Sequence, residues 1–167
     1  MWSRPKKAAV AFVVVLGLAF AAAQFVRPEY ATAATDPSHT LQAQVGTPKG
    51  LAAVVDRACG DCHSNVTTSG WYTRVAPLSW IMARAVTEGR KAVNFSEWVT
   101  YSPVQQRALL TASCQDAING TMPVRAYTRL RPDAQLSPQD VETICAASRQ
   151  FERNAASNAE PQGRRVR

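Results

Sequence analysis

One short pattern, Cys59-Gly60-Asp61-Cys62-His63, constrains this chain more than any other feature of its sequence. Two thiols at this spacing can form thioethers to the two vinyl groups of one porphyrin, while the histidine that follows presents an imidazole to the iron. The pattern therefore predicts one covalent haem c, held by Cys59 and Cys62, with His63 as the proximal iron ligand. The fold must then provide an apolar surface for the porphyrin at the end of the helix that carries this pattern.

The same Cys-x-x-Cys spacing also occurs in thioredoxin-like redox sites and as half of a zinc site. A thioredoxin site follows a strand and opens a helix, whereas an apolar helical pattern runs directly into Cys59. A zinc site needs two further ligands, and the remaining cysteines, Cys114 and Cys145, lack paired spacing. Both alternatives therefore fit the sequence less well than haem attachment.

An apolar run from Ala8 to Val26, preceded by Arg4, Lys6 and Lys7, indicates a membrane segment. It is long enough for an uncleaved transmembrane helix. The alternative is a signal peptide that is cut after Ala23. Either reading exports the rest of the chain, because the positive charges stay inside, and places it on the periplasmic or outer face of a bacterial inner membrane or free in the periplasm.

The formal charge of +7 is concentrated at the two ends of the chain. Between Thr47 and Arg153, twelve basic and nine acidic residues leave a net charge of only +3. This distribution argues against nucleic-acid binding, which needs a basic patch on the folded domain.

The residues that mark helix ends, together with the spacing of the apolar residues, predict an all-α fold. We expect a cytochrome-c-like bundle of about four helices around one haem, preceded by a single transmembrane helix. Proline at the start of a helix, after a hydroxyl residue in three cases, marks the expected helix starts at Pro48, Pro77, Pro103 and Pro138. No alternating pattern indicates a strand. Long loops are expected at 65–76, 91–101 and 121–137. The predicted organisation is a membrane segment at 1–26, an extended linker at 27–47, a haem-binding domain at 48–153 and a disordered basic tail at 154–167.

An electron-transfer haem needs a second axial ligand, and the candidates are Met122, Met82, His39 and Cys114. Met122 is favoured because it lies in a loop between the helix-ending Gly120 and Pro123, which stiffens the chain behind the thioether. Met82 shares a helical face with apolar residues, and His39 falls in the linker. An open or water-bound distal site is the main alternative.

With these residues identified, the chain resembles the bacterial single-haem "haem-binding domain" family, whose members are similar to cytochromes c and usually carry an N-terminal membrane segment. The resemblance covers about residues 50 to 150. It implies a cytochrome-c-like helical fold with His63 as proximal and Met122 as distal ligand, but no partner or pathway. The matching segments are Cys59 to Asn65, Trp71 to Trp80, Glu88-Gly89-Arg90, Asn94 to Trp98, Gly120 to Pro123 with Tyr127, and Arg131 to Ser137.

Cys114 and Cys145 depart from the family pattern, and each falls on the inward face of a predicted helix. In an oxidising compartment they could form a disulfide between the third and fourth helices, contributing roughly 3 kcal/mol through loop entropy. The alternative is two buried thiols that act as small apolar residues.

Aromatic residues are dense in the loops that are expected to wrap the porphyrin, and Arg74 is predicted to bind a haem propionate because it follows Trp71 and Tyr72. Solvation of the Arg74 side chain is the alternative.

Three functions remain open. The favoured one is an electron carrier, not an enzyme, that exchanges electrons with an unidentified redox protein and needs no catalytic residue. A haem-based sensor or peroxidase-like protein would instead use an open distal site. The third possibility is a structural role, in which the haem stabilises a protein-binding domain.

Overall fold

The computed structural model describes residues 4–30, 32–44, 47–68 and 70–159 of this chain, without the side chains of 155–159. Within these ranges the secondary structure is helical and no strand is present. The predicted all-α class is therefore confirmed.

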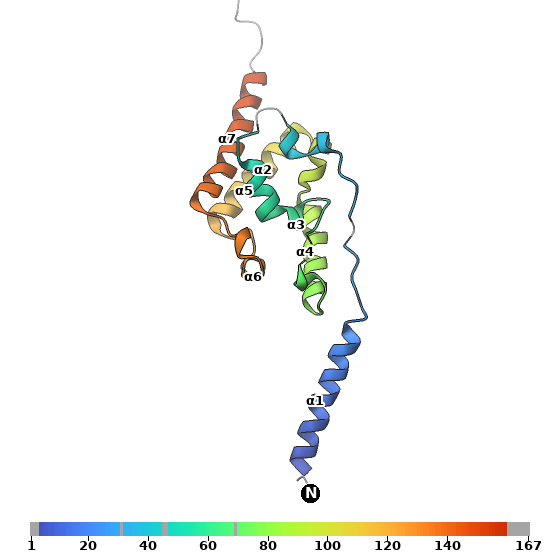
Figure 1. Cartoon of the computed structure of the whole chain (residues 1–167). Coiled ribbons are helices and arrows are strands. Elements are labelled where there is room, and N and C mark those ends of the chain that lie inside the picture. The colour runs from blue at the N-terminus through green and yellow to red at the C-terminus, as the bar shows by residue number, and fades with distance from the viewer. Residues whose placement is uncertain (1–3, 31, 45–46, 69, 160–167) are drawn as a thin grey trace, which may run out of the picture.

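Helix α1 spans Arg4–Ala23 and projects away from the remaining helices (Figure 1). None of its residues is buried against the protein. It is the described helix that is long and apolar enough to cross a membrane, a property that membrane anchors and signal sequences share. The rest of the described chain forms a helical domain beyond its C-terminal end.

The segment predicted as an extended linker at 27–47 is packed against the domain instead. It contains two short 3₁₀ turns, η1 (Pro37–His39) and η2 (Leu41–Ala43). Leu41 is completely buried in the main hydrophobic core, which also contains Trp98, Leu110 and Ile144. Tyr30 packs against a second cluster, which contains Tyr72. The polar and small residues around Leu41 hid this contribution, because one apolar residue gives no periodic signal.

The predicted helix that leads into the cysteine motif is present, but it begins later and is irregular. It consists of α2 (Leu51–Val54), a π-type turn η3 (Val55–Cys59) and α3 (Gly60–His63), which we together call the motif helix. Its start lies at Leu51 rather than at Pro48. Leu51, Val54 and Val55 are buried in the main core, which fixes the position of the motif relative to α5 (Pro103–Asn119) and α7 (Pro138–Ala159).

Helix α4 (Leu78–Ala92) follows the 3₁₀ turn η4 (Trp71–Thr73) and starts one residue after the predicted Pro77. The expected loop at 91–101 contains the end of α4 and the 3₁₀ segment η5 (Phe95–Thr100). Phe95 and Trp98 of η5 are buried in the main core.

Helix α5 (Pro103–Asn119) has the predicted boundaries, and its ends explain why. At its start the Ser102 hydroxyl and the Gln105 side chain form a reciprocal capping box. At its end Gly120 adopts a left-handed conformation, with φ of 65°, which strongly favours glycine.

The expected loop at 121–137 contains α6 (Arg125–Leu130) and the 3₁₀ turn η6 (Pro132–Ala134). The last helix, α7 (Pro138–Ala159), begins at the predicted proline. It continues past the predicted start of a disordered tail at Asn154, so that prediction was wrong for residues 154–159. Residues 160–167 of the predicted tail lie outside the described residues.

Helices α5 and α7 pack side by side, and a disulfide joins Cys114 of α5 to Cys145 of α7. The main core lies between these two helices, the motif helix and η5. A second cluster is formed by Tyr72, Met82, Tyr127 and Ala134, and Cys62 of α3 packs against it.

Candidate functional site

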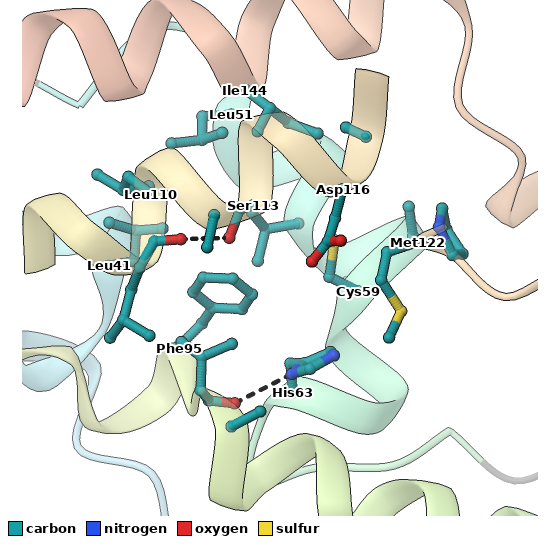
Figure 2. Close-up of a pocket in the computed structure, with 18 of the residues that line it drawn as sticks. Leu41, Leu51, Cys59, His63, Phe95, Leu110, Ser113, Asp116, Met122 and Ile144 are labelled. Atoms are coloured by element: carbon teal, nitrogen blue, oxygen red, sulfur yellow. Dashed lines mark hydrogen bonds between the residues drawn. The ribbon is translucent and has the colours of Figure 1, made fainter. Parts of the chain in front are cut away.

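A largely apolar cavity lies between the motif helix, α5 and the loop that follows α5 (Figure 2). Its volume is about 910 Å³ when the open mouth is included. The residues that line it are mainly aliphatic, with one phenylalanine, one thiol, one imidazole and one thioether: Leu41, Leu51, Val55, Ala58, Cys59, His63, Ala92, Val93, Phe95, Leu109, Leu110, Ala112, Ser113, Asp116, Ala117, Met122, Pro123, Leu136 and Ile144.

The imidazole of His63 is oriented by a backbone carbonyl. Its Nδ1 lies 3.1 Å from the carbonyl oxygen of Val93, the residue after α4. A carbonyl oxygen can only accept a hydrogen bond, so Nδ1 carries the proton and donates it. The Nε2 atom is then left with its lone pair, in the tautomer that can bind a metal. Figure 2 shows this bond at the edge of the cavity.

Met122 lies on the loop after α5, and the end of that helix holds the loop in place. The Thr121 hydroxyl donates to a carboxylate oxygen of Asp116 at 2.6 Å, and the Thr121 amide donates to the Asp116 carbonyl at 3.0 Å. The thioether of Met122 and the ring of His63 point toward one another in Figure 2. The structure thus brings together two residues that are 59 positions apart in the sequence.

The two cysteines of the motif differ in their surroundings. Cys59 lines the cavity, whereas Cys62 packs against the second cluster. Burial raises the pKa of Cys59 to about 12, assisted by the nearby Cys62. Burial and then the charge of Asp61 raise the pKa of Cys62 to about 11. Both side chains are therefore protonated thiols at neutral pH in this structure, and neither forms a disulfide.

The structure places the other distal-ligand candidates away from the cavity. Met82 is buried in the second cluster, as its helical face predicted. His39 is about half exposed on η1 and lies 3.7 Å from Asp36. Cys114 is joined to Cys145.

Arg74 does not line the cavity. It lies next to η4 and lines a different hollow, together with Gln24, Arg27 and Tyr30. The structure therefore gives no support to the prediction that Arg74 binds a haem propionate. Among the aromatic residues expected around a porphyrin, Phe95 lines the cavity, whereas Trp71 is 60% exposed elsewhere.

Sequence reasoning missed the role of Asp61, because it occupies one of the two variable positions of the Cys-x-x-Cys-His motif and belongs to no other recognisable pattern. Its carboxylate is 4% exposed and accepts hydrogen bonds from the Tyr127 hydroxyl at 2.7 Å, the Arg131 guanidinium at 2.9 Å and the Thr68 amide at 2.8 Å. Burial, followed by the hydrogen bond to Asp61, raises the pKa of Tyr127 well above its ordinary value. The network joins α3 to α6 and η6, which are far away in the sequence.

Asp116 was missed as well, because a single acidic residue on a helix usually faces solvent. Its carboxylate points toward the cavity, which Cys59 and Met122 also line (Figure 2). The signal available in the sequence was its position four residues before the glycine that ends α5, where a side chain can reach the following loop.

The donor set of the cavity fits a haem. The oriented imidazole of His63, the thioether of Met122 and the thiol of Cys59 line one cavity, and apart from Asp116 and Ser113 the remaining wall is apolar, as a porphyrin ring requires. Among the residues that the structure describes, no group of three or more His, Cys, Asp or Glu side chains could hold a bare metal ion. His63 and Met122 are the residues that could ligate a haem iron here.

No curated protein and no solved structure matches the chain. A family model described as "Haem-binding domain" matches residues 18–150, which include the cavity, the cysteine motif and the Met122 loop. The match covers most of the chain, in agreement with the resemblance seen in the sequence. The protein therefore belongs to the haem-binding domain family and binds haem.

Proposed function

We propose that the chain holds one haem c, bound covalently through Cys59 and Cys62 with His63 and Met122 as axial ligands, and that it transfers electrons at the outer surface of a membrane. The observation that supports this proposal best is the bond from His63 Nδ1 to the Val93 carbonyl. It leaves Nε2 available for iron and limits rotation of the ring, which is how proteins fix a ligating histidine.

The thiols of Cys59 and Cys62 would each add across one vinyl group. The sulfur bonds to one vinyl carbon and the thiol hydrogen goes to the other, so nothing is oxidised or reduced and no group leaves. Cys59, the last residue of η3, already lines the cavity, and Cys62 follows three positions later in α3. Haem extraction with acidified acetone tests the attachment: the chromophore should stay with the wild-type polypeptide. A Cys59→Ala/Cys62→Ala variant should release it, and release from the wild type would refute covalent attachment.

Ligation by histidine and methionine supplies a low-spin iron with a raised reduction potential, which suits electron transfer. The chain's own residues keep the site largely dry, because aliphatic side chains form most of its wall, and the majority of them come from the motif helix and α5. Met122 is 44% exposed, so this edge of the site is open to a redox partner. Electron transfer at that edge requires no catalytic residue.

The decisive experiment compares visible and near-infrared spectra of wild type, Met122→Ala and the matched control Met82→Leu. The methionine-to-iron charge-transfer band should be present in the wild type, lost in Met122→Ala and retained in Met82→Leu, because Met82 lies in the second cluster. Loss of the band in both variants would instead reflect a general disturbance of the fold.

The exposure of Met122 also favours one alternative, a haem sensor or peroxidase-like protein in which the methionine is absent from the iron or readily displaced. This alternative predicts a high-spin wild-type spectrum and rapid binding of carbon monoxide. A wild-type spectrum without the methionine band would support it and overturn the electron-carrier proposal.

Two observations support an exported, tethered protein. Helix α1 is long and apolar enough to span a membrane, and the Cys114–Cys145 disulfide suits an oxidising compartment such as the bacterial periplasm. The mass of the purified chain tests the tether: it should include α1. A mature chain that begins at Gln24 would show cleavage and refute the anchor.

A further inference from the structure

The segment that follows α1 forms hydrogen bonds with residues at and just before the start of α4. The side-chain oxygen of Gln24 accepts from the Ala76 amide at 3.0 Å, directly beyond the C-terminal end of α1. The Trp80 indole donates to the Val26 carbonyl at 2.8 Å. The Tyr30 hydroxyl donates to a carbonyl of α4 at 2.8 Å. These contacts fix the end of α1 against one part of the haem domain.

The length of α1 sets the depth of that contact. Its 20 residues, at about 1.5 Å per residue, give a helix of about 30 Å, the thickness of the hydrocarbon core. Gln24 therefore emerges at the level of the lipid headgroups, and Ala76, to which it is bonded, lies at the same level. Figure 1 shows that η4 and the start of α4 are the part of the domain nearest to α1.

This part of the domain carries exposed apolar side chains that the haem cavity does not use. The interfacial patch, as we name it, consists of Trp71, Val75, Trp80 and Ile81, which are 60%, 36%, 39% and 60% exposed. The indole of Trp80, which donates a hydrogen bond to the Val26 carbonyl, is therefore also part of this patch. Tryptophan is enriched where a membrane meets water, because its ring is apolar while its N–H can bond to polar groups.

Positive charge accompanies the patch. Arg27 and Arg74 line one hollow between the chain after α1 and the start of α4. Neither guanidinium forms a hydrogen bond or ion pair with the other described residues. Arg84 lies one turn beyond Trp80 on α4, and Glu29 is the acidic residue between Arg27 and Tyr30. A guanidinium pair of this kind suits the phosphate of a lipid headgroup.

We propose that the interfacial patch docks on the outer surface of the membrane that α1 spans, and that Arg27 and Arg74 bind the phosphates of anionic lipids there. The inference rests on the proposed tether and adds an orientation to it. Insertion of the patch connects the domain to the membrane at two points, the helix α1 and the patch. The haem cavity therefore keeps a constant orientation relative to the bilayer. A redox partner in the same membrane then meets a fixed face of the domain.

The test uses the full haem-loaded chain in lipid nanodiscs that contain an anionic lipid. Ile81→Cys and Val104→Cys each introduce one thiol, at side chains that are 60% and 65% exposed in the structure. Val104 is on α5, outside the patch. A water-soluble maleimide is added, the labelled peptide is identified by mass spectrometry, and the labelling rates of the two thiols are compared.

Docking predicts that Ile81→Cys reacts at least about tenfold more slowly than Val104→Cys, because headgroups shield its thiol from the aqueous reagent. Addition of Arg27→Gln and Arg74→Gln, or exchange for a purely zwitterionic lipid, should raise the Ile81→Cys rate toward that of the control. Equal rates with α1 intact would overturn docking while leaving the tether in place. A chain whose mass lacks α1 would refute the tether and docking together.

Discussion

Gly89 of α4 provides the sharpest test of how the domain positions its cysteine motif. The helix passes so close to α3 that a Cβ atom added to Gly89 would lie 2.5 Å from the carbonyl oxygen of Cys62 and 3.1 Å from its carbonyl carbon. The obstacle is backbone of the motif itself, so a side-chain rotation cannot relieve it. Gly89→Ala must therefore separate α3 from α4.

The size of the effect follows from two opposing contributions. Overpacking costs about 1–3 kcal/mol, and a contact with backbone belongs at the upper end of that range. Alanine in place of glycine inside a helix returns about 1 kcal/mol of helix propensity. The net loss of folding free energy is then about 2 kcal/mol, which lowers the melting temperature by roughly 10 °C for a domain of this size.

The assay is thermal and urea unfolding of the haem-loaded protein, followed by circular dichroism, with Glu88→Ala as the matched control. Glu88 is exposed and its salt bridge to Lys91 is a surface pair, so the control should change stability by less than about 0.5 kcal/mol. Because α4 leads directly to Val93, whose carbonyl orients His63, Gly89→Ala should also lower the yield of attached haem. A Gly89→Ala protein as stable as the wild type, or more stable, would show that the two helices do not approach this closely.

Three further predictions concern the surroundings of the cavity. Asp61→Ala should destabilise the domain by about 3 kcal/mol in urea unfolding, because it leaves the partly buried Arg131 guanidinium without its buried partner; the exposed Asp133→Ala control should cost less than about 1 kcal/mol, and equal losses would contradict the network. Reduction of the Cys114–Cys145 disulfide should lower the unfolding free energy by about 3 kcal/mol, since its loop spans 31 residues; a reductant-insensitive midpoint, with thiol counting as the check on reduction, would contradict this. Asp116→Asn should raise the reduction potential measured by redox titration, because it removes a negative charge that favours ferric iron; an unchanged or lower potential would place the carboxylate away from the iron.

The sequence alone determined the features that are encoded locally. The motif from Cys59 to His63 is contiguous, so its spacing can be read without a fold. The two ends of α5 were predictable because a helix cap involves residues within one turn of one another, as in the Ser102 capping box and the left-handed Gly120. The apolar run of α1 was recognisable for the same reason.

Only the tertiary structure decided which distant residues meet. It brings the Val93 carbonyl to His63 and turns Met122 toward the same cavity, whereas it places Arg74 beside Arg27. It also buries Leu41, in a segment whose composition resembles a linker. These outcomes depend on contacts between elements far apart in the chain, and the physical reason is that such contacts are selected by the packing of the whole core, which no local pattern records.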